Sequence, residues 1–138
     1  MSGFRVHTVD DGRNMPHEYL PAGGLAPKLG MALKLEGGKL ALAKGAEKPA
    51  FISMTEREAA CKEGGAIPVI RAAGDVCWET EASADLSGIK TGDKVTISTD
   101  GMSVTATKGG TAQVMGMEGT AAGSRVFVRF GGNCEDCP

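Results

Sequence analysis

The sequence predicts an all-β fold, a small antiparallel β-barrel or β-tulip-like sandwich with an extended N-terminal arm. Three observations predict it. Short runs of alternating apolar and polar residues recur along most of the 138 residues, and this period of two is typical of half-buried strands. Glycine occurs 21 times, about twice its usual share of roughly 7%, and without a collagen-like period it indicates many turns. No helical crossover units separate the strand-like runs, so parallel pairing is disfavoured.

Residues 1–28 are predicted to form the arm. Several prolines deny backbone donors and disfavour a helix, and Gly23-Gly24 adds conformational freedom. The apolar residues are isolated, so this segment cannot bury a core of its own. It is either a loosely packed terminus or an arm that becomes ordered on a partner, with Phe4 and Tyr19 as anchors. The candidate contact residues are Phe4, Arg5, Val6, His7, Pro16, His17, Tyr19 and Leu20.

Residues 29–131 are predicted to form the β-barrel domain, which begins with three strands. Apolar residues alternate within 31–35 and again within 39–43, and Gly37-Gly38 between them suits the positive φ of a tight hairpin. A lysine-rich loop follows and leads into a third predicted strand over 50–54.

The middle of the domain predicts one ambiguous segment and two further strands. Thr55 and Glu58 have the spacing of a helix capping box, but a helix of two turns is marginal alone, and an irregular loop fits residues 55–62 equally well. Strands are predicted over 66–71 and 76–80. Pro68 indicates that the first of these lies at a sheet edge or begins at the proline.

The last third of the domain has the most regular alternation. Asp100-Gly101 is a strong hairpin signal between two predicted strands. The four strands predicted here cover residues 94–98, 102–107, 112–117 and 124–130. About nine strands therefore make up the domain, and residues 132–138 form a separate C-terminal tail.

Charge and hydropathy limit the classes of partner. The formal net charge is −2, from 15 basic and 17 acidic residues, and no basic tract is present. Nucleic acid is therefore not an expected partner. No apolar run approaches the roughly 20 residues that span a bilayer, so we expect no membrane partner. The N-terminus lacks the apolar stretch of a secretory signal, which indicates folding in a cytoplasm with the cysteines mainly as thiols.

The tail carries a CxxC motif, formed by Cys134 and Cys137. Such a pair can be half of a zinc site or a redox pair, but zinc usually takes four ligands. The other candidate ligands are Cys61, Cys77, His7 and His17, which show no second paired spacing. A solvated or packed tail is the favoured interpretation. A metal site, a disulfide and a crosslink remain alternatives.

No constellation of residues predicts catalysis. A nucleophilic cysteine or serine needs a nearby base, and both histidines lie in the arm, where a preorganised site is hard to build. The acidic residues lie mostly in turns or at strand ends, where aspartate has a structural role. We therefore expect a non-enzyme with no cofactor and no catalytic residue.

One stretch of the chain resembles a known family. APKLGMALKLEGGKLALAKGAEKPAFISM, residues 26–54, resembles the opening barrel segment of lambda-type phage head decoration proteins. In that family a polar arm rich in proline and glycine precedes two short strands, an alanine-rich turn and an apolar strand. AIPVIRAAGDVCWET, residues 66–80, is similar to the next hairpin. The second meander, over 90–130, and the CEDC tail depart from this pattern, and both suit the wider group of β-barrel or β-tulip capsid cement proteins.

The resemblance implies a structural virion protein that is made in the host cytoplasm and located on the capsid exterior. Its partner would be the major capsid protein, and a homotrimer is the expected assembly. The arm would add a strand to the capsid, and repetition over the lattice would give avidity. Two alternatives stay open: another phage structural module for tail or fibre attachment, and a small metal- or thiol-dependent protein that uses Cys134 and Cys137.

Overall fold

The fold consists of two antiparallel β-sheets. The computed structural model describes residues 3–9, 17–57, 62, 65–72 and 76–130, and these residues contain eleven strands and no helix. The strands are β1 (Arg5–Val9), β2 (Glu18–Pro21), β3 (Ala32–Glu36), β4 (Lys39–Leu42), β5 (Phe51–Ser53), β6 (Ala66–Arg71), β7 (Val76–Glu81), β8 (Lys94–Ile97), β9 (Val104–Lys108), β10 (Ala112–Met117) and β11 (Arg125–Arg129).

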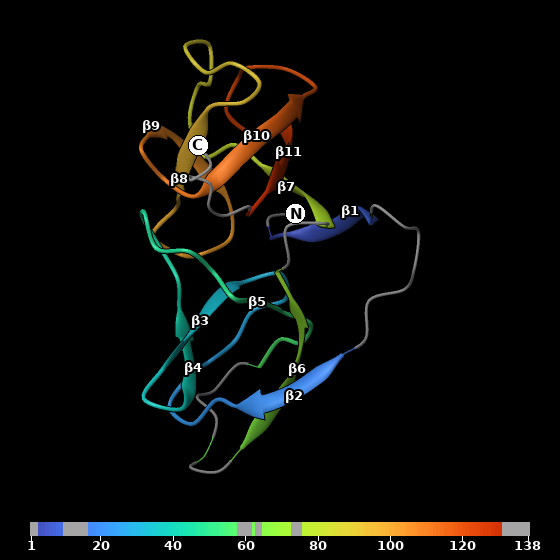
Figure 1. Cartoon of the computed structure of the whole chain (residues 1–138), viewed down its shortest axis with the longest axis vertical. Coiled ribbons are helices and arrows are strands. Elements are labelled where there is room, and N and C mark those ends of the chain that lie inside the picture. Colours follow the sequence, from blue (N-terminus) through green and yellow to red (C-terminus); the bar gives the residue numbers. More distant parts are fainter. Residues whose placement is uncertain (1–2, 10–16, 58–61, 63–64, 73–75, 131–138) are drawn as a thin grey trace.

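The six-stranded sheet A has the order β1-β7-β11-β10-β8-β9, and the five-stranded sheet B has the order β2-β6-β5-β3-β4. Figure 1 shows most of sheet A towards one end of the long axis and sheet B towards the other, with β1 between them. The predicted all-β antiparallel class is confirmed. Neither sheet closes into a barrel, so of the two predicted architectures the structure has the sandwich-like one.

Glycine forms the predicted hairpins. Gly37 and Gly38 have φ values of 62° and 82°, and Glu36 pairs with Lys39 directly across them. Positive φ at both central positions is the requirement of a two-residue hairpin turn. The hairpin at Gly101 is wider than predicted, because the Ser98 N–H donates to the carbonyl oxygen of Ser103 at 2.8 Å. The following strand therefore begins at residue 104 and not at 102.

The apolar residues form two clusters. The larger lies between the sheets, and Trp78 is fully buried in it. The smaller lies against the other face of sheet B and includes Leu33, Leu40 and Ile67. Because neighbouring residues of a strand point to opposite faces, Ala32 joins the first cluster and Leu33 the second. Sheet B is thus packed on both faces. It curls around the smaller cluster, whose members come mainly from sheet B itself, so that its outer strands β2 and β4 come close together.

The turn between β8 and β9 fastens sheet A to sheet B. The Ala32 N–H of β3 donates to the Gly101 carbonyl oxygen at 2.8 Å, and Gly45 and Ile97 exchange two backbone hydrogen bonds of 2.9 Å. Gly101 has a φ of 71°, and a Cβ at this position would lie 2.4 Å from Cδ1 of Leu42. The close approach of the two sheets therefore requires glycine here.

The described part of residues 1–28 belongs to both sheets. The sequence predicted no strand here, yet β1 pairs with β7 and β2 pairs with β6. Phe4 is only 1% exposed, and its ring lies edge-on to that of Phe130 with centroids 5.2 Å apart. Burial of this ring makes the start of the chain part of the core. The sequence predicted instead an arm that extends away from the core.

Candidate functional site

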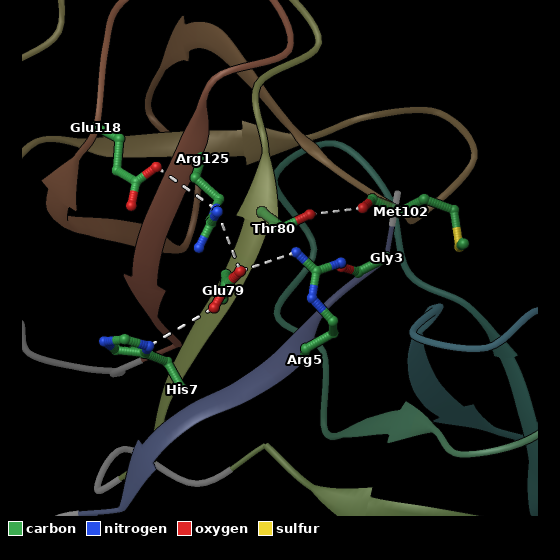
Figure 2. Close-up of polar contacts among 8 residues, drawn as sticks. All are labelled: Gly3, Arg5, His7, Glu79, Thr80, Met102, Glu118 and Arg125. Carbon is green, nitrogen blue, oxygen red and sulfur yellow. Dashed lines mark hydrogen bonds and ion pairs between the residues drawn. The ribbon is translucent and has the colours of Figure 1, made fainter. Parts of the chain in front are cut away.

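A cluster of charged side chains connects the N-terminal strand to sheet A (Figure 2). We call it the Glu79 cluster, and its members are Arg5, His7, Glu79, Glu118 and Arg125.

Strand register explains why the members of this cluster meet. β7 lies between β1 and β11, so Glu79 has Arg5 opposite it on one side and Phe127 on the other. His7 falls at the register shift between Val6 and Thr8, a β-bulge that leaves it without a paired residue.

The Glu79 carboxylate interacts with three basic side chains. Nη2 of Arg5 donates a hydrogen bond to Oε2 of Glu79 at 3.1 Å. Nε of Arg125 lies 3.5 Å from the same oxygen and 3.5 Å from Oε1 of Glu118. Nδ1 of His7 lies 3.6 Å from Oε1 of Glu79. One carboxylate therefore links β1, β7 and β11.

The environment favours the ionised form of Glu79, whose side chain is 17% exposed. The hydrogen bond from Arg5 is the largest cause that lowers the pKa of Glu79, and the charges of Arg5, Arg125 and His7 act in the same direction. Partial burial opposes them by raising the pKa, and the net effect is a pKa below the ordinary value of 4.5. The cluster thus holds a charge that stabilises the attachment of β1.

Two further contacts fix the orientation of β1 in the cluster. The His7 ring packs on Phe127 of β11, with centroids 4.4 Å apart and an angle of 41° between the planes. Nη1 of Arg5 also donates to the carbonyl oxygen of Gly3 at 3.3 Å. The arrangement holds the N-terminal strand in one register against β7.

β2 is held in a similar way at the edge of sheet B. Nη2 and Nε of Arg71 donate to Oε1 and Oε2 of Glu18 at 2.9 and 3.1 Å, a bidentate pair between β6 and β2. The Arg71 guanidinium also lies over the Phe51 ring at 5.2 Å. Tyr19, the next residue on β2, is 68% exposed. The strand therefore presents an aromatic side chain from a fixed backbone.

The structure distributes the predicted contact residues over several environments. Arg5 and His7 come together at Glu79, whereas Phe4 lies in the larger apolar cluster and Leu20 packs against the smaller one. The exposed members are Val6, His7, His17 and Tyr19. Pro16, Cys61, Cys134 and Cys137 lie outside the described residues. Contact of any of these residues with a capsid stays a prediction.

Sequence reasoning did not connect Glu79, Glu118 or Arg125 with the N-terminal segment. Glu79 is 74 positions from Arg5, and only the pairing of β1 with β7 brings the two together. A charged residue at one strand position is ordinary, so the sequence contains no local signal for the cluster.

A scan against models of known protein families and a search of curated proteins found no match. Within the part of the chain that the structure describes, no group of three or more His, Cys, Asp or Glu side chains is placed to hold a metal ion. The same described residues include no helix long and apolar enough to cross a membrane.

Proposed function

We propose that this chain is a structural protein of a phage particle, which binds the outer surface of the capsid and stabilises contacts between capsid subunits. The observation that carries the proposal is the position of the N-terminal strands, because β1 forms an edge of sheet A and β2 an edge of sheet B. An edge strand leaves one row of backbone N–H and C=O groups available to another chain. Strand addition at such an edge is a recurring way in which proteins bind one another.

Exposed apolar side chains accompany both edges. Tyr19 on β2 and Val6 on β1 are 68% and 39% exposed. Tyrosine supplies a large contact area at a small cost in side-chain entropy, and it is enriched among the residues that dominate binding energy. The bidentate pair of Arg71 and Glu18 holds the backbone beside Tyr19, so little ordering would be needed on binding.

The arrangement of residues 15–80, which resembles that of lambda-type head decoration proteins, also supports the proposal. The partner in this proposal is the major capsid protein, and the assembled form on the virion exterior is a homotrimer. A modest contact repeated around a trimer and over a symmetric lattice gives high avidity.

The experiment uses heads from a phage in which the coding sequence has been deleted. The purified protein is mixed with these heads, and both the bound protein and the resistance of the heads to heat are measured. We expect binding at a fixed ratio to capsid subunits and a higher rupture temperature. The mass of the protein in solution tests the trimer.

Two matched variants test which surface binds. Tyr19→Ala should weaken capsid binding at least about tenfold, which corresponds to about 1.4 kcal/mol. Met115→Ala removes another exposed side chain, 43% exposed on β10, and should bind as the unmodified protein does. Protein that stays in the supernatant would contradict the proposal. Protein found on the tail by electron microscopy would favour the tail or fibre module.

A further inference from the structure

Residues 3–9 are held by contacts with distant parts of the chain. The Gly3 N–H donates to the Met102 carbonyl oxygen, and the Phe4 N–H donates to the Gly30 carbonyl oxygen, both at 2.9 Å. β1 pairs with β7 in sheet A, whereas β2, the next strand of the chain, pairs with β6 in sheet B. β1 therefore forms no ladder with the strand that follows it, and it can separate without breaking the pairing of β2.

Two glycines make the site of this segment close-fitting at its start. Gly3 has a φ of 114°, and a Cβ on it would lie 2.7 Å from the Leu29 carbonyl oxygen. Gly30 has a φ of 85°, and a Cβ on it would lie 2.7 Å from the backbone nitrogen of Phe4. These backbone atoms cannot move aside as a flexible side chain can, so the site accepts a segment that begins with glycine.

Side chains of the site recognise the two residues that follow Gly3. The Phe4 ring is 1% exposed and packs edge-on against Phe130. Figure 2 shows Arg5 reaching from β1 to the Glu79 carboxylate, to which it donates a hydrogen bond of 3.1 Å. An apolar environment for one aromatic ring and a carboxylate for one cation therefore select the sequence Gly-Phe-Arg.

The rest of β1 is held less firmly. Val6, His7 and Thr8 are exposed, and the register with β7 shifts between Val6 and Thr8. A bulge of this kind interrupts the ladder of backbone hydrogen bonds. Segments with few buried contacts and an exposed ladder are those that open locally. The attachment of β1 therefore depends on its first residues, and a second strand with the same first residues can compete for the site.

From the distant partners of β1, the close-fitting start of its site and the weaker hold on its remainder, we infer that copies of this chain exchange β1. Residues 3–9 of one copy then occupy the site of another. A second copy is the partner because it carries the same Gly3-Phe4-Arg5 sequence that the site selects.

The exchange keeps the contacts that β1 makes within one chain. Its cost is therefore mainly that of bringing copies together, and its extent rises with protein concentration. Exchange around a closed ring of copies leaves no site empty. Each copy then supplies Arg5 and His7 to the Glu79 carboxylate of its neighbour. This inference goes beyond the proposed function, because it does not depend on the identity of the particle.

The pairing of Thr8 with Cys77 between β1 and β7 provides a test of the exchange. Paired residues of antiparallel strands have Cα atoms about 4.5–5.5 Å apart, which is within the range of a disulfide. One full-length chain carries Thr8→Cys and Cys77→Ser, and a second full-length chain keeps Thr8 and Cys77. In both chains serine replaces Cys61, Cys134 and Cys137. A disulfide between β1 and β7 can then form only between copies.

The two chains differ in mass by a tag. They are unfolded together in urea, which removes any kinetic barrier to opening, then refolded and oxidised with glutathione disulfide. We expect a hybrid disulfide dimer on a non-reducing gel after refolding at about 1 mM, and at least about tenfold less of it after refolding at about 10 μM. Absence of the hybrid dimer at the higher concentration would overturn the inference.

Matched variants separate exchange at this site from random contact between thiols. Phe4→Ala on the chain that carries Thr8→Cys should lower the yield of hybrid dimer at least about tenfold, because it removes the ring that fills the site. Val6→Ala, at a side chain 39% exposed, should leave the yield unchanged. Phe4→Leu keeps most of the apolar volume and should fall between the two, which covers the case in which Phe4→Ala does not fold.

A thiol at the opposite edge of sheet A serves as the second control. Thr107 is exposed on β9, and Thr107→Cys in place of Thr8→Cys should give no hybrid dimer. An equal yield from Thr107→Cys would show random collision of thiols and would overturn the inference. The same conclusion would follow if neither Phe4→Ala nor Phe4→Leu lowered the yield.

Discussion

The replacement Phe4→Ala tests whether the N-terminal segment belongs to the core. Phe4 is 1% exposed and lies edge-on to Phe130. A buried phenylalanine replaced by alanine costs about 3–5 kcal/mol, and the edge-to-face pair contributes about 0.5–1.5 kcal/mol of that. A domain of this size is stable by about 5–15 kcal/mol and loses about 3–4 °C of Tm per kcal/mol. We therefore expect Tm to fall by about 10 °C or more.

Urea denaturation and thermal unfolding followed by circular dichroism measure the effect. Val6→Ala is the control on the same strand, since Val6 is 39% exposed and should cost less than about 1 kcal/mol. Phe4→Leu retains most of the apolar volume and should fall between the two, which keeps the test informative if Phe4→Ala does not fold. If Phe4→Ala were no more destabilising than Val6→Ala, residues 1–28 would be the separable arm that the sequence predicts.

Two further replacements test the contacts that hold the sheets together. Glu79→Gln should lower the free energy of unfolding by about 1 kcal/mol at pH 7, since the partners of Glu79 are partly exposed. The pKa of Glu79 is lowered in the folded protein. The stabilisation is therefore present above the ordinary pKa of 4.5 and is lost as the pH falls through the folded value. Urea denaturation from pH 7 down to about 3.5 should show the two proteins converge, and a constant difference would exclude Glu79 as the source. Gly101→Ala should lower the free energy of unfolding by about 1–2 kcal/mol because of the left-handed φ, and by a further amount because the new Cβ meets Leu42. Gly37→Ala is the control: its φ is 62° and no atom lies within 4 Å of a Cβ there, so it should lose only the backbone part. Equal losses of unfolding free energy would show that Leu42 moves aside freely.

The strands that sequence reasoning predicted are those whose signal is local. The alternation of 31–35 and 39–43 and the two glycines between them lie within a short window, and the structure has β3 and β4 there. Residues 66–71 form β6 with the predicted bounds. The prediction drawn from Pro68 is wrong, because β6 lies between β2 and β5 and not at an edge, and it begins at Ala66 and not at the proline. Residues 55–62 lacked a decisive pattern; residues 55–57 are irregular, and four of the remaining five lie outside the described chain.

β1 and β2 could not be predicted, because their strand character depends on distant partners. β1, RVHTV, has no clean alternation between its faces, and a bulge at His7 interrupts its register. β2, EYLP, has only four residues and ends in proline, which has no backbone N–H to donate. Both segments form strands because they pair through backbone hydrogen bonds with β7 and β6, respectively.

The open sheet edges on which the proposed function depends could not be predicted for a related physical reason. A hairpin is a property of a few consecutive residues, but an open edge is a property of strand order across the whole sheet. Gly23-Gly24 shows the difference: in the sequence this pair indicated only freedom, whereas in the fold it lines a hollow beside β4. Gly24 has a φ of 86°, and no atom lies within 4 Å of a Cβ built on it. The left-handed conformation of the backbone, and not a lack of space, therefore favours glycine at this position.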